Sequence, residues 1–117
     1  KHARRGADTH RARMELLHER IAGRLPLIGV GNLYTGRDIA KAFETGWAEF
    51  IALGKTVMIN PDLADLVREG RDADIQTDLD PARADHYRLP DALWQRCLTN
   101  SPWLPPVKGM ERQIVDI

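Results

Sequence analysis

The chain has 117 residues, of which 43% are hydrophobic, and its 17 basic side chains balance 17 acidic ones for a formal net charge of zero. This apolar content is enough for a buried core, while the balanced charge creates no overall field that would favour nucleic acid or a membrane surface. No apolar run approaches the roughly 20 residues that cross a bilayer, and the single cysteine, Cys97, has no partner for an internal disulfide. We therefore expect a cytoplasmic globular protein without a nucleic-acid or membrane partner.

The chain opens with a basic cluster at residues 1–6 (KHARRG), followed by an amphipathic stretch. The stretch predicts a helix from about residue 8 or 9 to Ala22, ended by Gly23. The apolar stripe of this helix consists of Met14, Leu17 and Ile21. We interpret the basic cluster as a solvated loop, which is the usual fate of a charge run.

Residues 26–61 predict a βαβ unit. Two short apolar runs, 27–30 and 50–53, lack polar alternation and are typical of strands buried on both faces. Between them the spacing predicts a helix over residues 38–45, with Thr35 placed to cap its start and Gly46 placed to end it. Parallel strands joined through such a helix end at the same edge of a sheet, so the turns that follow both strands are expected to converge.

These two turns, Gly31-Asn32 and Gly54-Lys55, form the predicted binding site. Backbone N–H groups at a glycine turn favour an anion, and Lys55 adds a full positive charge. The residues by themselves therefore predict a site for a phosphate-like anion, and they do not name the ligand.

The C-terminal half contains further helix and turn signals. Asn60-Pro61 predicts a helix start, with Asn60 as the cap and Pro61 at the first helical position, and Gly70 ends that helix. Residues 71–84 are predicted to form a loop or short turns, and Pro90 opens another short helix.

The last stretch, residues 101–109, is rich in proline and is expected to be irregular. We interpret Trp94 and Trp103 as aromatic side chains that cover local apolar surface, with contacts to a partner subunit as the alternative.

The chain resembles the C-terminal part of the old yellow enzyme family of NADH:flavin oxidoreductases, specifically its bacterial NADH-dependent flavin oxidoreductase branch. The residues that carry the resemblance are Gly29-Val30-Gly31, Thr35, the helix that closes at Gly46, the run 48–55 (AEFIALGK) and Asn60-Pro61-Asp62. Members of this family are FMN-containing (β/α)8 barrels, and such a barrel needs about 250 residues. The resemblance therefore implies an α/β fold that is the C-terminal fragment of a TIM barrel. Residues 1–70 would hold its last two parallel strands with their helices, and residues 71–117 would form an irregular and helical extension.

The resemblance also implies an enzyme that uses FMN, with NAD(P)H as the reductant. It assigns the FMN phosphate to the amides of Gly31, Asn32 and Gly54 and to the amide and side chain of Lys55. Most of the family has arginine at the position of Lys55, and lysine binds phosphate as a point charge without the two-pronged fork. Arg4 or Arg5 would lie in the loop after strand six, near the mouth of the barrel, if it is not simply solvated.

The family's catalytic residues come mainly from earlier strands, so we expect none in this chain. The implied partners are a small-molecule acceptor such as an activated alkene, the remainder of the barrel and, in a homo-oligomer, a second subunit.

Two other functions remain open. One is another phosphate-binding TIM-barrel enzyme, such as a dihydroorotate dehydrogenase-like flavoenzyme or a phosphosugar enzyme, because fold does not fix function. The other is a non-enzymatic small α/β interaction module in which Gly31 and Gly54 serve only tight turns. We expect no metal site, because His10 and His18 lie too far apart on one helix to share an ion. Glu44 and Glu49 are expected to be solvated.

Overall fold

The computed structural model describes residues 10–111, and its contacts divide the chain into two compact units. The strand unit comprises Lys1–Leu33 and Arg37–Leu53, and the C-terminal unit comprises Tyr34–Gly36 and Gly54–Ile117. The division falls before Gly54, whereas the sequence places a boundary after Gly70. The assignment of barrel and extension to residues 1–70 and 71–117 remains a prediction. Arg4 and Arg5 lie outside the described residues.

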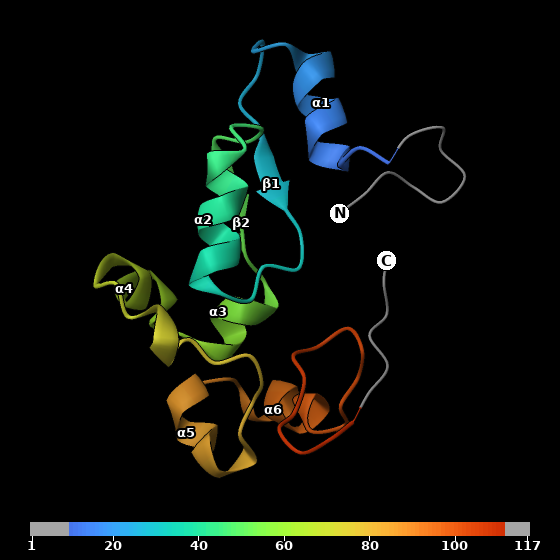
Figure 1. Ribbon diagram of the computed structural model, residues 1–117. Helices are drawn as coiled ribbons and strands as arrows, with labels where there is room; N and C mark the ends of the chain where they lie inside the picture. The colour runs from blue at the N-terminus through green and yellow to red at the C-terminus, as the bar shows by residue number, and fades with distance from the viewer. Residues whose placement is uncertain (1–9, 112–117) are drawn as a thin grey trace. The chain divides into compact units, whose positions relative to one another are not determined.

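The strand unit contains a two-stranded parallel sheet, as predicted (Figure 1). Strand β1 spans Ile28–Val30 and strand β2 spans Phe50–Ala52, and their register aligns each residue of one strand with the corresponding residue of the other. Val30 is thus paired with Ala52 at the carboxyl edge. Both strands end level with each other because the register has no offset.

Two helices accompany the sheet. Helix α1 spans Arg13–Ile21 and ends at Ala22, which adopts a left-handed conformation with φ of 52°. The described chain before Arg13 is not helical, so α1 is shorter than the stretch from residue 8 or 9 that the sequence predicts. Helix α2 spans Gly36–Glu44. Gly46 follows it with φ of 68°, which confirms this glycine as the stop signal.

One face of the sheet is covered and the other is exposed. A Cβ atom added to Gly29 would lie 3.1 Å from Ala48 Cβ and 3.7 Å from Met14 Cε, so this face packs against other parts of the unit. The prediction that both strands are buried on both faces is wrong for the described chain, because the described residues pack against only one face of the sheet. The exposed side chains of the opposite face are Ile28, Val30 and Phe50, with 64%, 71% and 59% of their surface accessible.

The C-terminal unit is built from short helices around a core of its own. Its α-helices are α3 (Lys55–Ile59), α4 (Leu63–Arg68), α5 (Ala84–Tyr87) and α6 (Asp91–Cys97), and two 3₁₀ helices span Asp72–Asp74 and Pro81–Arg83. The buried centre consists of Ile59, Leu79, Tyr87 and Cys97. Ile59, on α3, therefore packs with residues from far later in the chain, which explains why the main segment of this unit begins at Gly54.

A buried side-chain amide connects α3 to the segment after α4. Asn60 is 2% exposed, and its Nδ2 donates hydrogen bonds to the carbonyl oxygens of Thr56 at 3.0 Å and Gln76 at 2.9 Å. Its Oδ1 accepts a hydrogen bond from the Gln76 N–H at 2.8 Å. The prediction that Asn60 caps α4 through its side chain is wrong, because Asp62 is the N-cap and these buried backbone groups use the Asn60 amide.

The end of the described chain folds back onto the same unit. Leu79 and Val107 form an isolated parallel bridge, and the Lys108 N–H donates to the Leu79 carbonyl at 2.8 Å. Trp94 stacks on Tyr87 with ring centroids 5.7 Å apart, so it covers local apolar surface as predicted. Trp103 is 65% exposed and does not. No helix within residues 10–111 has the length and apolar character needed to span a membrane.

Candidate functional site

The predicted phosphate residues directly follow the two strands, but they are divided between the two units. Gly31 and Asn32 follow β1 within the strand unit. Gly54 and Lys55 open the C-terminal unit, where Lys55 is the first residue of α3. The parallel register brings the two strand ends to one edge, and the convergence of the two turns themselves stays a prediction.

Gly31 and Gly54 both border open space. Among the described residues, nothing lies within 4 Å of a Cβ atom built on either glycine, and neither has a positive φ. Gly29 and Gly36 differ, since an added Cβ would meet Ala48 at Gly29 and the Asp72 carboxylate at Gly36. Packing therefore accounts for two of these glycines, while the backbone at Gly31 and Gly54 is left open to the approach of a ligand.

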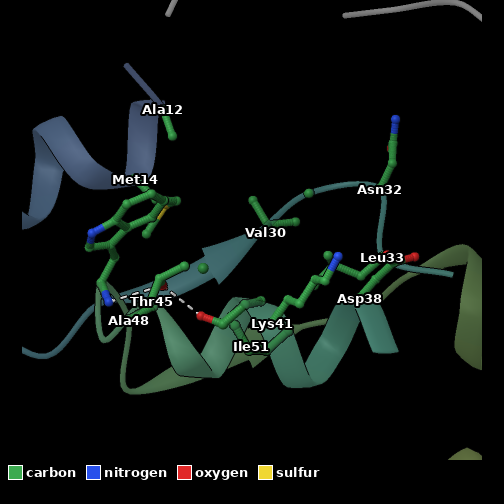
Figure 2. Close-up of a pocket in the computed structure, with 14 residues that line it drawn as sticks. Ala12, Met14, Val30, Asn32, Leu33, Asp38, Lys41, Thr45, Ala48 and Ile51 are labelled. Carbon is green, nitrogen blue, oxygen red and sulfur yellow. Dashed lines mark hydrogen bonds between the residues drawn. The ribbon is translucent and has the colours of Figure 1, made fainter. Parts of the chain in front are cut away.

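A cavity of about 340 Å³ lies beside Gly31 and Asn32 within the strand unit (Figure 2). Its volume falls in the range of ligand pockets, roughly 300 to 1,000 Å³. Its lining is mostly apolar and comes from α1, both strands, α2 and the segments that follow β1 and α2. The lining residues are Ala12, Met14, Gly29, Val30, Gly31, Asn32, Leu33, Asp38, Lys41, Ala42, Thr45, Trp47, Ala48 and Ile51.

Thr45 shapes the wall of this cavity through two hydrogen bonds. Its hydroxyl donates to the Ala42 carbonyl at 2.7 Å and accepts from the Trp47 N–H at 3.2 Å, as the dashed lines in Figure 2 show. These bonds fix the turn after α2 and so place Trp47 along the wall. Lys41 and Asn32 supply polar groups to the same cavity. The sequence indicated Asn32 as a binding residue, but it did not indicate Lys41.

Lys55 is engaged by the far end of the chain. Its Nζ donates a hydrogen bond to the Pro102 carbonyl oxygen at 2.9 Å. The Gly54 carbonyl accepts from the amides of Val57 at 3.1 Å and Met58 at 3.2 Å, which fixes the start of α3. Sequence reasoning missed Pro102, because a backbone carbonyl acceptor leaves no signal in the residue types.

Glu49 connects the starts of the two strands. Its Oε2 accepts a hydrogen bond from the Leu27 N–H at 2.6 Å, while the Glu49 N–H donates to the Leu27 carbonyl at 3.0 Å. The hydrogen bond from Leu27 lowers the pKa of the Glu49 carboxyl. Glu49 is exposed, as the sequence predicts, yet its carboxylate also has this structural role.

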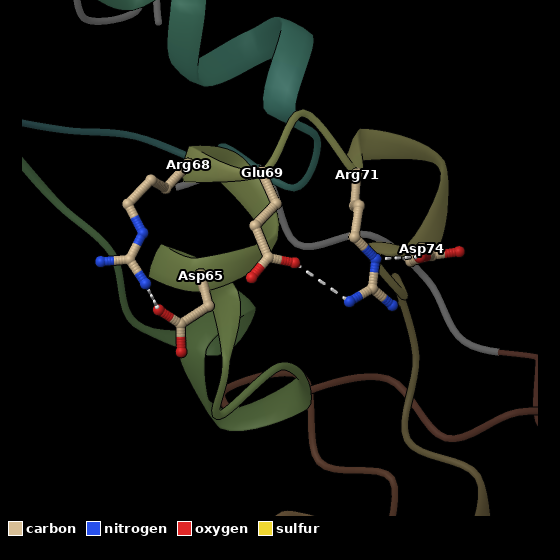
Figure 3. A network of polar contacts seen from close by, with 5 residues as sticks. All are labelled: Asp65, Arg68, Glu69, Arg71 and Asp74. Atoms are coloured by element: carbon tan, nitrogen blue, oxygen red, sulfur yellow. Dashed lines mark hydrogen bonds and ion pairs between the residues drawn. The ribbon is translucent and has the colours of Figure 1, made fainter.

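Other charged groups belong to a surface network at the end of α4 (Figure 3). The Arg71 guanidinium lies between two carboxylates, with Nη1 at 3.3 Å from Glu69 Oε2 and Nε at 2.8 Å from Asp74 Oδ2. Arg68 forms an ion pair with Asp65. These side chains are at least half exposed, so such pairs contribute little to stability. Within residues 10–111, no group of three or more His, Cys, Asp or Glu side chains is arranged to hold a metal ion.

The one cysteine is unsuited to nucleophilic chemistry. Cys97 is fully buried in the core of the C-terminal unit. Burial raises the pKa of its thiol, and a protonated thiol is a poor nucleophile.

Comparison with known proteins identifies a relative of this chain. The chain is 37% identical, over 103 residues, to the probable NADH-dependent flavin oxidoreductase YqiG of Bacillus subtilis (strain 168). The chain is thus similar to a probable NADH-dependent flavin oxidoreductase. The aligned residues are 88% of this chain and 27% of the relative, so the chain spans about a quarter of the relative's length. No family model matches the chain.

This similarity confirms the resemblance that the glycine-bounded βαβ unit indicated. The partial coverage of the relative is consistent with a C-terminal fragment of such an enzyme. The two parallel strands and their helices agree with the α/β class.

Proposed function

We propose that this chain is the C-terminal portion of an FMN-dependent NAD(P)H oxidoreductase of the old yellow enzyme type and that it contributes the loops that bind the FMN phosphate. The observation that carries the proposal is the 37% identity, over 88% of the chain, to a relative named as a probable NADH-dependent flavin oxidoreductase. The acceptor is a small oxidised molecule such as an activated alkene, and the enzyme is cytoplasmic.

The architecture supports a place within a (β/α)8 barrel. Barrel strands alternate residues that face the interior with residues that face the outer helices. Gly29 faces packed neighbours, whereas Ile28 and Val30 lie exposed on the other face of β1. A two-stranded sheet with an apolar open face needs further strands to cover it, and the remainder of the barrel supplies them.

The predicted residues fit a phosphate group. Gly31 and Gly54 leave their backbone open, which allows the close approach that hydrogen bonds from amides to phosphate oxygens require. Lys55 adds positive charge through a side chain whose Nζ donates a hydrogen bond to the Pro102 carbonyl. Asn32 is exposed next to Gly31. Its backbone amide is the second phosphate donor that we assign to the turn after β1.

FMN held by Gly31, Asn32, Gly54 and Lys55 would supply the hydride-transfer chemistry between NAD(P)H and the acceptor. The role of this chain is to hold the phosphate end of the cofactor and so fix the position of the flavin. We assign no catalytic residue to residues 1–117.

Titration of the full-length protein with FMN, followed by flavin fluorescence, tests the proposal. The parent protein should bind FMN tightly, and Lys55→Ala should weaken binding by about 1.5–3 kcal/mol, the typical contribution of a hydrogen bond to a charged group. Gly54→Val should weaken it further, because the added side chain would occupy the open space beside the backbone. Lys108→Ala is the matched control, since Lys108 pairs with Asp80 at 3.2 Å and is not part of the proposed site.

If Lys55→Ala held FMN as tightly as the parent, the assignment of Lys55 would be wrong. A full-length protein that binds inorganic phosphate or a sugar phosphate but no flavin would instead be another phosphate-binding barrel. A protein that binds neither would be the interaction module.

A further inference from the structure

The contact between Lys55 and Pro102 connects the proposed phosphate site to the C-terminal extension. The two residues are 47 positions apart in the chain, and both belong to the C-terminal unit. The donor is the ammonium of the residue that we assign to the FMN phosphate. The acceptor is a backbone carbonyl, so its position is set by the fold of the extension around it.

That part of the extension is anchored to the core just beyond Pro102. The Leu104 N–H donates to the Ser101 carbonyl at 3.1 Å, which closes a turn around Pro102 and Trp103. Leu104 packs against the core cluster, and Pro105 and Val107 are almost completely buried. We call residues 101–104 the tail turn. Its carbonyl is therefore presented to Lys55 by an anchored segment, even though Trp103 at its tip is exposed.

We propose that the tail turn is a positioning element for the flavin phosphate: the Pro102 carbonyl holds the Lys55 ammonium in place, so that FMN binding and ordering of the tail turn stabilise each other. This inference rests on the proposed function for the identity of the phosphate ligand. A lysine ammonium carries three N–H donors, and the same nitrogen is able to bind a neutral carbonyl and a phosphate oxygen together.

The physical reason for coupling is the flexibility of lysine. Four carbons with rotatable bonds separate the ammonium from the backbone, so an untethered lysine samples many positions. A carbonyl contact from an anchored turn restricts that sampling before the ligand arrives, which lowers the entropic cost of binding. Linkage is reciprocal: if the tail turn improves the affinity for FMN, bound FMN must stabilise the tail turn by the same factor.

Hydrogen exchange of the full-length protein, with and without saturating FMN, measures this coupling. The reporter is the peptide that contains the Leu104 amide, which is hydrogen-bonded within the tail turn. In the parent protein, FMN should slow exchange of this peptide at least three-fold. Lys55→Met should speed its exchange about five-fold without FMN, should abolish the response to saturating FMN, and should raise the Kd for FMN about ten-fold or more.

Two further variants separate positioning from a general effect on the fold. Lys55→Arg keeps the charge and the donors, so it should restore both FMN affinity and the response of the tail turn. Lys108→Met removes the ion pair with Asp80 elsewhere in the extension and should leave the FMN affinity and the response of the tail turn unchanged.

Equal exchange of the tail turn with and without FMN in the parent protein would overturn the proposal, and this comparison needs no variant to fold. Unchanged exchange in Lys55→Met without FMN would overturn it too, because Lys55 would then not hold the turn. If the parent bound no FMN while Lys55→Met still loosened the turn, the proposed function and the flavin coupling would both be rejected, and only the tether itself would stand.

Discussion

The two units of this chain bury their apolar residues to very different extents. In the described part of the strand unit, the buried apolar side chains are Ile39 and Ala48, which keep 8% and 9% of their surface exposed. The C-terminal unit fully buries Ile59, Leu79 and Cys97 and closes its core by folding the tail back onto it. The strand unit also exposes large apolar side chains on its sheet.

The two units differ in how far their stability depends on residues outside this chain. The C-terminal unit has local helices, a shared core and a satisfied buried amide, so its own residues account for its fold. The strand unit has a sheet with two members and an uncovered apolar face, an arrangement that is only marginally stable alone. The comparison leads to three predictions for the full-length protein, in addition to the two tests of FMN binding and tail ordering.

The largest effect is expected from Ile28→Asp on the open face of β1. If further barrel strands cover this face, the change buries an unpaired carboxylate and should lower the free energy of unfolding by about 3–5 kcal/mol. Urea unfolding of the protein without FMN measures this. Leu25→Asp is the control, because Leu25 is 66% exposed and lies outside the sheet, and it should change stability by less than about 0.5 kcal/mol. A tolerated Ile28→Asp would show that the sheet face is exposed in the full-length protein.

A smaller effect is expected from Asn60→Ala in the C-terminal unit. The change removes both hydrogen bonds that the amide donates and leaves the Gln76 N–H without its acceptor, which should cost about 2–3 kcal/mol. The same urea unfolding measures it. Gln76→Ala is the matched control, because it keeps the backbone of residue 76 and removes only an exposed side chain. Equal stability of the two variants would mean that the buried amide does not hold this unit together.

The smallest effect is expected from Glu49→Gln, which tests the pH dependence of the strand unit. The pKa of Glu49 is lowered in the folded state, so its charge stabilises the fold above the ordinary carboxyl pKa of about 4.3. That contribution is lost as the pH falls through the lowered pKa. The variant should therefore be slightly less stable than the parent near pH 7, and the difference should shrink as the pH falls below the ordinary carboxyl pKa and vanish once Glu49 is protonated in the folded state. A difference that persisted unchanged at low pH would contradict this role of the charge.

Much of the strand unit was predictable from the sequence, because its signals are local. Short apolar runs gave the two parallel strands, and Gly46 gave the end of α2. The one-sided burial of the sheet was not predictable. An apolar run predicts that a strand is buried, but it does not identify the residues that pack against it. The fold of the tail was also missed, because a bridge between Leu79 and Val107 depends on contacts distant in sequence.

The candidate site remains a prediction from the sequence. Glycines at strand ends identified Gly31 and Gly54, and the structure leaves open space at both. Hydrogen bonds between side chains and distant backbone groups leave no signal in the sequence. The sequence therefore indicated neither the bond from Lys55 to the Pro102 carbonyl nor the bond from the Leu27 N–H to Glu49. The sequence predicted Asn60 as a helix cap, which is wrong, because a short amide side chain suits a cap and a buried bridge equally well.

The residue after Asn60 gives this buried amide a chemical advantage over time. Asparagine ages by deamidation when the backbone nitrogen of the next residue attacks the side-chain carbonyl and forms a cyclic imide. Pro61 has no backbone N–H, so this attack is blocked at the start. Deamidation would replace the Nδ2 donor with a negative oxygen facing the carbonyls of Thr56 and Gln76. The Asn60-Pro61 pair thus protects the C-terminal unit against deamidation at a buried position.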